Sequence, residues 1–349
     1  MRSAVWKRSN AMAWYQVKGN DADTVFSSRI RFARNLTGYR FDKGLSEQDA
    51  GAIIERIGTA LGEDYVKTDM QLLSPTKTEA LVEQHVISRD FAAKKGPHAL
   101  YRNDNKSLSV MALEEDHIRL QCILPGLALQ DAYRFACECD DRLDAALDIA
   151  YDEQLGYLTH CPTNLGTGMR ASVMLFLPAL RAAGMIASLS HQLSKLGLTM
   201  RGLYGEGSEP SGCLYQVSNQ VTLGCSEEEI LRKLEEAVRS IIENERRLRG
   251  SLSAEAADRR ADRIHRAEGT LRHATMISSQ EFFSLYTDLK LGIALGEITS
   301  ITDEALNTLL ISILPATLSE HTGDAPKNAA ARDKQRAAFI KKALGVSEQ

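Results

Sequence analysis

The sequence has little that would mark a specialised class of protein. Aromatic residues make up only 6% of its 349 residues, and the shares of hydrophobic (44%) and charged (25%) residues are ordinary for a globular protein. The formal net charge is −4, so composition does not indicate nucleic-acid binding. The apolar run ASVMLFLPAL stops at Arg181 and is too short for a membrane span. A chain of this length suffices for one large domain and a smaller one.

Secretion signals and metal-binding cysteine patterns are also lacking. The N-terminal stretch MRSAVWKRSN carries basic residues but no apolar segment, so no secretion signal is expected. The six cysteines match no zinc-ligand spacing, and a chain of this size needs no disulfides. We therefore expect reduced, mostly buried thiols in a cytoplasmic protein. Cys161 is the exception, because it lies in a glycine-rich loop where a thiol can become reactive.

This loop reads CPTNLGTGMR and ends at Arg170. It resembles a phosphate cradle, but it lacks the Lys-Ser/Thr ending of a P-loop. Any phosphate held near it must be bound by other groups.

The pattern of apolar residues predicts an antiparallel sheet. VFSSRIRFARNL alternates and predicts a strand from about Val25 to Arg31. SLSVMALEEDHIRLQCIL predicts two strands around an acidic turn, and CLYQVSNQVTLG predicts a further hairpin strand. The strands do not alternate regularly with helices. The sequence therefore favours an α+β fold, an antiparallel sheet flanked by helices.

The last hundred residues have a different pattern. Ser226 and Glu229 have the spacing of a capping box and open a long helix, which we expect to pack on the core. Charge-rich helical sequence follows, with further helices expected near 279–291 and 303–314 and a loop near 322–331. We place a boundary near residue 252, which divides the chain into a domain of residues 1–252 and a small all-α domain of residues 253–349.

Five arginines lie beside glycines or at predicted strand ends. Arg29 and Arg31 alternate within SSRIR and therefore project from one sheet face, whereas Arg119, Arg170 and Arg201 are scattered along the chain. Each alone is more consistent with a solvated surface residue. The guanidinium fork matches phosphate oxygens, however, and a cluster of such groups could hold a triphosphate without a P-loop.

Two acidic segments accompany the arginines. Glu114, Glu115 and Asp116 form one turn, and Glu206 lies between glycines in YGEGSE, where the backbone can move. Either segment alone is more consistent with a helix cap or a solvated turn. Together they suit a positively charged substrate.

Four segments in this order resemble the phosphagen (guanidino) kinases: SSRIRFARNL, the EED-H-x-R element, CPTNLGTGMRAS and RGLYGEGSE. The resemblance runs from about residue 27 to residue 248. It is closer to the bacterial protein arginine kinases of the McsB type, which share the RGLYGEGSE form and lack the helical N-terminal domain of the kinases of free guanidino compounds. Fewer than thirty residues precede Ser27 here, too few for that domain. The segment 332–337, RDKQRA, fits the phosphoarginine-binding RDxxRA motif of this group.

The resemblance implies an ATP-dependent protein arginine kinase that marks proteins for Clp protease degradation and acts in stress regulation. Glu115 would be the catalytic carboxylate, Glu206 its partner, and Cys161 would lie beside the substrate guanidinium. The implied ATP-binding residues are Ser27, Ser28, Arg29, Ile30, Arg31, His85, Arg119, Arg170, Ala171, Ser172, Val173, Met174, Arg201, Gly202, Leu203, Tyr204, Gly205 and Glu206. The implied allosteric phosphoarginine site comprises Arg332, Asp333, Arg336 and Ala337.

The implied cofactors are ATP and Mg²⁺, with the metal held by the nucleotide phosphates and not by a protein site. Implied partners are arginine-bearing proteins, a zinc-binding activator protein, Clp protease components and a second copy of the chain in a homodimer. Leu113 departs from the group, which has Asn before the acidic turn, so the turn holding Glu115 is expected to be looser. Three alternatives stay open: a kinase of free guanidino compounds, a non-catalytic phosphoarginine-binding adaptor and, more weakly, a transcriptional repressor, for which no basic recognition helix stands out.

Overall fold

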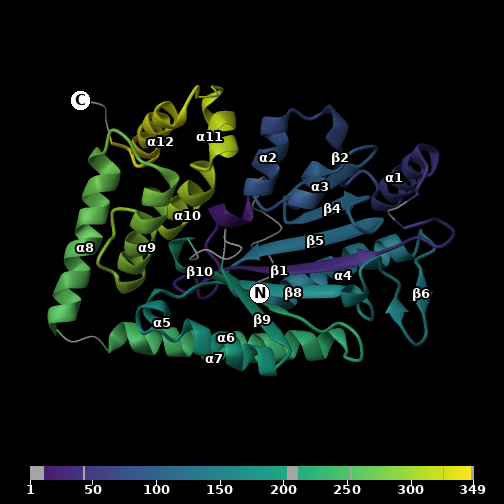
Figure 1. Cartoon of the computed structure of the whole chain (residues 1–349), viewed down its shortest axis with the longest axis horizontal. Helices are drawn as coiled ribbons and strands as arrows, with labels where there is room; N and C mark the ends of the chain where they lie inside the picture. Colours follow the sequence, from purple (N-terminus) through teal and green to yellow (C-terminus); the bar gives the residue numbers. More distant parts are fainter. Residues whose placement is uncertain (1–11, 42–43, 203–210, 252–253, 325, 347–349) are drawn as a thin grey trace.

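The computed structural model describes residues 12–41, 44–202, 211–251, 254–324 and 326–346. Eight of its strands form an antiparallel sheet of order β2-β3-β4-β5-β1-β8-β10-β9, flanked by helices (Figure 1). The predicted α+β class is confirmed. The sheet strands are β1 (Val25–Arg34), β2 (Tyr65–Asp69), β3 (Ala99–Asn103), β4 (Leu108–Ala112), β5 (Ile118–Pro125), β8 (Met169–Phe176), β9 (Leu198–Gly202) and β10 (Leu214–Asn219), while β6 (Tyr151–Asp152) and β7 (Gly156–Tyr157) form a separate hairpin.

Helices α1 (Glu47–Leu61), α4 (Leu129–Asp144), α6 (Ile186–Lys195) and α7 (Glu227–Gly250) pack on one face of the sheet. The strands alternate, so that residues such as Ile30 and Val173 enter this core while their neighbours point away. Burial of each such side chain contributes about 1.5–3 kcal/mol. The capping box of Ser226 and Glu229 begins α7, as predicted.

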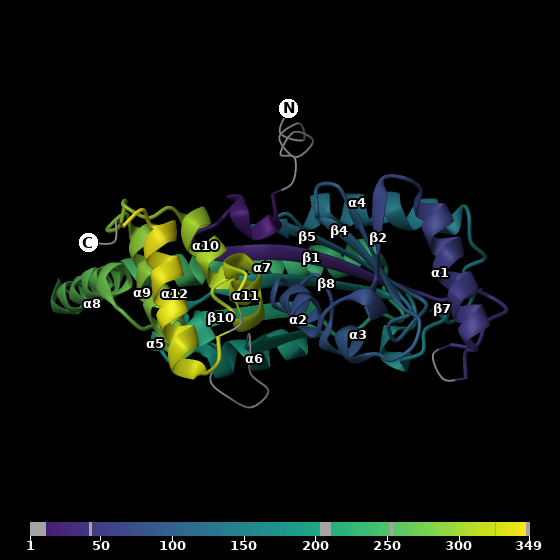
Figure 2. The same cartoon turned by 90° about the horizontal axis from the view of Figure 1, so that it is seen from above.

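Among the described residues, helices cover the opposite face at its two ends. At one end α2 (Pro75–Glu83) and α3 (Arg89–Ala93) enclose a small apolar cluster. At the other end lie the C-terminal helices, coloured green to yellow in Figures 1 and 2. They are α8 (Ala254–His273), α9 (Ser279–Leu295), α10 (Asp303–Ser312), α11 (Pro315–Thr322) and α12 (Ala329–Ala343). Apolar side chains of α8, α9, α10 and α12 share a second core with Phe26, Met174 and Phe176 of the sheet.

The remaining short elements are helix α5 (Pro178–Ala182) and the 3-10 turns η1 (Trp14–Gln16), η2 (Met70–Leu72), η3 (Pro162–Asn164) and η4 (Ser211–Cys213), of which η1 packs near α10. β1 extends three residues beyond the predicted end, because Phe32 and Arg34 continue the alternation. The predicted charge-rich helical segment is present as α8, and the helices predicted near 279–291 and 303–314 are present as α9 and α10, whereas α11 and α12 were not predicted as separate helices. Among the described helices, none has both the length and the apolar character needed to cross a bilayer. The boundary at residue 252 stays a prediction.

Candidate active site

The sheet register brings the five arginines to one face. Arg31 on β1 lies directly opposite Arg170 on β8, and Arg29 lies two residues further along the same strand. Arg119 on β5 and Arg201 on β9 occupy positions of the same parity in the ladder. Cross-strand neighbours share a face, so all five side chains leave the sheet on the side away from the larger core.

The guanidinium groups lie close enough to perturb one another. Burial, followed by the charges of Arg119 and Arg170, lowers the pKa of Arg29 to about 10. Burial and the charges of Arg29, Arg119 and Arg170 also lower the pKa of Arg31, and burial and Arg201 lower that of Arg170. Arginines nevertheless stay charged at neutral pH. An anion placed among them would relieve both the repulsion and the loss of solvation.

Two of these arginines have polar atoms that nothing in the described part of the chain satisfies. The Nε–H groups of Arg31 and Arg170 are buried and donate to no acceptor there. The Nη2 of Arg170 donates to Ser218 Oγ at 3.2 Å. Buried donors without acceptors are rare, and oxygen atoms of a bound phosphate would supply the missing acceptors. The arrangement therefore fits a polyphosphate.

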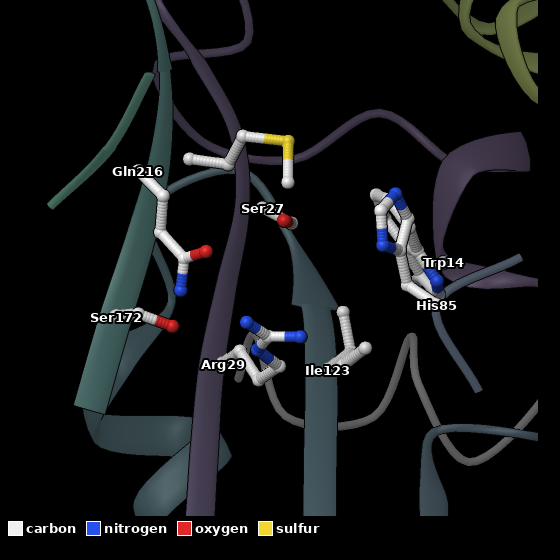
Figure 3. Close-up of a pocket in the computed structure, with 8 residues that line it drawn as sticks. Trp14, Ser27, Arg29, His85, Ile123, Ser172 and Gln216 are labelled. Carbon is white, nitrogen blue, oxygen red and sulfur yellow. The ribbon is translucent and has the colours of Figure 1, made fainter. Parts of the chain in front are cut away.

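A first pocket lies beside Arg29 and is lined by η1, the residues that follow α2, and the strands β1, β5, β8 and β10 (Figure 3). In Figure 3, Trp14 and His85 lie together on one side and Ser172 and Gln216 on the other, with Arg29 between them. The rings of Trp14 and His85 are 6.1 Å apart. Burial and the charge of Arg29 lower the pKa of His85 to about 3, so its imidazole is neutral. An aromatic wall facing polar side chains suits a nucleobase and its ribose.

A second pocket adjoins the first along β1. Arg29 lines the first pocket and Arg31 the second, and these two residues are about 7 Å apart along a strand. The second pocket also contains the acidic turn and Cys161. One continuous face thus carries an aromatic pocket, a row of guanidinium groups and a set of carboxylates, in that order.

The three carboxylates of the acidic turn have different surroundings. Burial alone would raise the pKa of Glu114, but its ion pair with Arg119 and hydrogen bonds from Ser88 and from the Glu115 backbone hold the pKa below its ordinary value. Asp116 is buried and accepts hydrogen bonds from Asn35 Nδ2 (2.6 Å) and His160 N (2.7 Å). These two carboxylates hold the turn in place.

Glu115 differs from its neighbours. No described residue donates a hydrogen bond to its carboxylate, which is half-buried and lines the second pocket. Burial raises its pKa, and the charges of Asp116 and Glu114 raise it further. A carboxylate that binds its proton more tightly than usual and faces a pocket is suited to accept a proton.

Leu113, which stands where the resembling family has Asn, begins this turn in the left-handed region, with φ +66°. Asn adopts this conformation readily, whereas a leucine does so at a cost. The Leu113 N–H donates to His117 O at 2.8 Å, and the side chain is buried in the larger core. Together with the bonds made by Glu114 and Asp116, these contacts hold the turn without the Asn amide.

The glycine-rich loop owes its glycines to close packing. Gly168 has φ +60°, and a Cβ there would lie 2.6 Å from Nη1 of Arg34. A Cβ on Gly166 would lie 2.2 Å from the carbonyl oxygen of Thr222. At these two positions the loop approaches its neighbours too closely for a side chain. The same loop places Cys161 in the second pocket, with its Sγ 3.0 Å from Thr163 Oγ1.

Arg34, the last residue of β1, supports this loop from the core side. Its Nη2 lies 2.7 Å from Asp140 Oδ2 on α4, and its Nη1 donates to the backbone oxygen of Thr167 at 3.1 Å. The guanidinium also stacks over Tyr157, 3.4 Å from the ring centre. Sequence reasoning did not single out Arg34, although it lies within SSRIRFARNL.

Four residues predicted to bind ATP have side chains on the opposite face of the sheet, and Arg201, although on the same face as the other arginines, lines neither pocket. Ser28, Ile30, Ala171 and Val173 have the opposite parity in β1 and β8, and their side chains point into or beside the larger core. Ser28 Oγ donates to Gly126 O and accepts from Ala128 N, which is a structural role. In contrast, the predicted residues Ser27, His85, Ser172 and Met174 line the first pocket.

The remaining predicted ATP-binding residues lie at the end of β9 or after it. Gly202 is the last residue of β9 and pairs with Tyr215. Leu203, Tyr204, Gly205 and Glu206 lie outside the described residues. Trp14, Ile123 and Gln216 line the first pocket without having been predicted. Only the alternation of β5 and β10 could have indicated Ile123 and Gln216, and no sequence signal pointed to Trp14.

The predicted phosphoarginine site lies on α12, and its residues line neither pocket. Arg336 is fully buried and donates to the backbone oxygens of Ile277 (2.7 Å) and Ile313 (3.0 Å) and to Asp333 (2.6 Å). Nε of Arg332 and Nη2 of Arg336 are buried without a partner among the described residues. Arg336 therefore connects α12 to neighbouring backbone, while two guanidinium nitrogens of the motif have no acceptor among the described residues. In the described part of the chain no three His, Cys, Asp or Glu residues are grouped as metal ligands.

Comparison with known protein families agrees with this geometry. Residues 52–248 match the family "ATP:guanido phosphotransferase, C-terminal catalytic domain", and residues 258–349 match "Protein-arginine kinase McsB C-terminal domain". The chain is 42% identical to the protein-arginine kinase of Caldanaerobacter subterraneus subsp. tengcongensis, over 94% of this chain and 99% of that protein. It is also 42% identical to that of Syntrophomonas wolfei, over 97% and 96% of the two chains.

Solved structures with the same fold include the duplicated taurocyamine kinase from Schistosoma mansoni, substrate-free, with a TM-score of 0.60 and 23% identity. That match covers 78% of this chain and only 42% of the duplicated one. A lombricine kinase matches with a TM-score of 0.59 and 23% identity, covering 70% of this chain and 74% of that one. These likenesses concern the fold alone. The two family matches and the near full-length identities show more: the chain is an enzyme of the protein-arginine kinase family, with a guanido phosphotransferase catalytic domain.

Proposed function

We propose that this enzyme transfers the γ-phosphoryl group of Mg-ATP to a guanidinium nitrogen of an arginine in a protein. The observation that carries the proposal is the order of groups on one sheet face. An aromatic pocket, unsatisfied guanidinium donors and a proton-accepting carboxylate follow one another along β1 and its neighbours. This order matches a nucleoside, its phosphates and an acceptor.

The nucleotide fits the residues that are present. Trp14 and His85 would enclose the base, and Arg29 would lie between the base and the phosphates. Arg31 and Arg170 have Nε donors without partners among the described residues, and these would bind phosphate oxygens. Mg²⁺ carried on the phosphates would neutralise part of their charge. Because phosphoryl transfer depends mainly on positioning and electrostatics, such an arginine can contribute roughly 10³–10⁵ in rate.

The acceptor guanidinium would lie between Glu115 and Cys161. A guanidinium is protonated and its lone pairs are delocalised, so it needs both orientation and a base. Glu115 takes the proton as the N–P bond forms, the bond between γ-phosphorus and the bridging oxygen breaks, and ADP leaves. Glu206, which lies outside the described residues, is proposed to orient the acceptor from a second side.

The acceptor is proposed to be an arginine within a polypeptide. The names of the relatives support this substrate. By the same resemblance we propose that phosphorylation marks proteins for Clp protease and serves stress regulation in the cytoplasm. A zinc-binding activator protein, a homodimer and feedback by phosphoarginine at Arg332, Asp333, Arg336 and Ala337 belong to the same proposal.

Incubation with Mg-ATP and either an unfolded model protein or free arginine tests the proposal. We expect acid-labile phosphoarginine on the protein, detected by mass spectrometry under neutral conditions, and little on free arginine. Phosphorylation of free arginine alone would favour a kinase of small guanidino compounds. Nucleotide binding without any transfer, even with Glu115 intact, would contradict the catalytic assignment and favour a binding adaptor.

A further inference from the structure

Glu83, a residue outside both pockets, connects the nucleotide pocket to the C-terminal helices. It is the last residue of α2 and is only 9% exposed. Its carboxylate accepts hydrogen bonds from the backbone N–H groups of Ala316 (3.0 Å) and Thr317 (2.7 Å) and from Thr317 Oγ1 (2.7 Å). Both N–H groups belong to the first turn of α11. A carboxylate there satisfies donors that have no partner within the helix and interacts favourably with its dipole.

Two residues after Glu83, the chain enters the nucleotide pocket. His85 has φ +59°, a left-handed conformation that a non-glycine residue adopts only when its surroundings hold it. Its backbone oxygen accepts a hydrogen bond from Gln121 Nε2 of β5 at 2.9 Å. The short segment from Glu83 to His85 is therefore fixed at both ends, by α11 on one side and by the sheet on the other.

The second member of the aromatic wall also depends on the C-terminal helices. Trp14 lies in η1, is 5% exposed and belongs to the core shared with α9 and α10. Figures 1 and 2 both place α2 beside α11, and α10 near the N-terminal turn. Both residues of the aromatic wall are thus connected to the C-terminal helices. Trp14 is connected by apolar packing, and His85 by the nearby buried carboxylate of Glu83.

We infer that Glu83 is a positioning residue for nucleotide binding: by capping α11 it holds His85 in the left-handed conformation that completes the pocket against Trp14. Glu83 touches neither substrate nor reacting atoms, so it acts only through His85. The inference deepens the proposed function and rests on the first pocket being the nucleotide site. It implies that docking of α11 and affinity for ATP change together, while the carboxylates of the acidic turn are unaffected.

Binding of a fluorescent ATP analogue, measured without acceptor, tests this on the full chain alongside steady-state kinetics. Glu83→Ala removes three hydrogen bonds to a charged group, so we expect ATP affinity to fall by about tenfold or more. The turnover number at saturating ATP and the KM for the acceptor should stay within about twofold, because the acidic turn does not move. Glu83→Gln keeps one acceptor oxygen and should restore part of the affinity.

Glu79→Gln is the matched control. Glu79 lies one turn earlier on α2 and forms only an exposed 3.4 Å pair with Arg89, so ATP affinity should not change. Thr317→Val removes one of the three bonds from the other side. Its effect should have the same direction as that of Glu83→Ala and should be smaller and non-additive with it.

Unchanged ATP affinity in folded Glu83→Ala would overturn the inference, as would a parallel loss of ATP affinity, acceptor KM and turnover, which indicates a purely structural role. If Glu83→Ala does not fold, Glu83→Gln and Thr317→Val decide by the same criteria. Failure of the unmodified protein to bind ATP would instead overturn the proposed function, and the inference with it.

Discussion

Arg31 and Arg170 lie directly opposite each other on the adjacent antiparallel strands β1 and β8. Like charges in this position destabilise a sheet, here with additional loss of solvation, because burial lowers the pKa of both groups. No described carboxylate forms an ion pair with either guanidinium. Such a destabilising arrangement is expected at a functional site, here one that binds an anion.

Arg170→Gln should therefore stabilise the free protein and weaken nucleotide binding at the same time. We expect the free energy of unfolding to rise by about 0.2–1 kcal/mol, since one member of the repelling pair is removed. Mg-ATP should raise the melting temperature of the unmodified protein clearly and that of the variant much less. Thermal unfolding with and without Mg-ATP measures both effects.

The control for this prediction is Arg232→Gln on α7, where Arg232 forms an exposed pair with Glu236. Its removal should change stability by less than about 1 kcal/mol and should not affect the response to ATP. A less stable Arg170→Gln protein that still responds fully to ATP would contradict the anion-binding role.

Glu115→Gln should remove turnover and leave ATP binding intact. Glutamine keeps the size of the side chain but cannot accept the proton of the acceptor guanidinium, so we expect kcat to fall about 10²- to 10⁴-fold. Asp90→Asn, which changes another carboxylate of the same pocket away from the acidic turn, should have a much smaller effect. Quenched-flow measurement of phosphoarginine formation separates the chemical step from ADP release. Wild-type turnover in Glu115→Gln would rule out the base assignment.

The same carboxylate should set the acid limb of the pH–rate profile. Burial, Asp116 and Glu114 raise the pKa of Glu115, so its proton is lost only above the ordinary range of a glutamate. As the pH falls through this raised pKa, Glu115 becomes protonated and kcat/KM for the acceptor should decline. Affinity for ATP should not follow this limb, because the burial-lowered pKa of His85, about 3, keeps the imidazole neutral there. An acid limb at or below the ordinary glutamate pKa would contradict the assignment.

Strand alternation accounts for most of what the sequence revealed about this site. It predicted that Arg29 and Arg31 share a face, and the strand register confirms this arrangement. The same alternation places the side chains of Ser28 and Ile30 on the opposite face of the sheet, which a contiguous sequence motif does not indicate. The length of β1 was underestimated because the break expected after Arg31 ignored the buried Phe32 and Arg34.

Contacts between segments far apart in the chain could not be predicted. Trp14 and His85 form one wall although 71 positions separate them, and the packing of η1 and of the segment after α2 on the sheet and on the C-terminal helices brings them together. Arg34 reaches Asp140 and Thr167 in the same way. Such pairings depend on how the elements dock, which local periodicity does not encode.

Arg34→Lys tests whether the glycine-rich loop is held from the core side. A lysine can reach Asp140 but cannot at the same time donate to Thr167 O and stack over Tyr157. All its donors lie on one nitrogen, whereas the planar guanidinium spreads them over three. We expect a loss of about 1–3 kcal/mol in the free energy of unfolding. Arg142→Lys, on the same helix as Asp140 but with an exposed partner at Asp64, should lose about 0–1 kcal/mol.

The loop that Arg34 holds also carries Cys161, so turnover in Arg34→Lys should fall by roughly tenfold or more, as misplaced groups in an active site commonly cause. Chemical denaturation and steady-state kinetics on the two lysine variants provide the comparison. Equal turnover in Arg34→Lys and Arg142→Lys would show that the loop keeps its position without the Arg34 contacts.

Alkylation of Cys161 should report occupancy of the acceptor pocket. All six cysteines are free; Cys161, Cys137 and Cys225 are partly exposed, but only Cys161 lines the second pocket. Burial raises the pKa of Cys137 to about 11 and also raises that of Cys225, so both should react slowly with iodoacetamide, since the thiolate is the nucleophile. An arginine-containing peptide together with Mg-ADP should slow labelling of Cys161 and leave the other two rates unchanged. Peptide mass mapping gives all three rates from one sample, and Cys161→Ser identifies the signal. Equal labelling of Cys161 with and without the peptide, at concentrations that support turnover, would place the acceptor elsewhere on the sheet face.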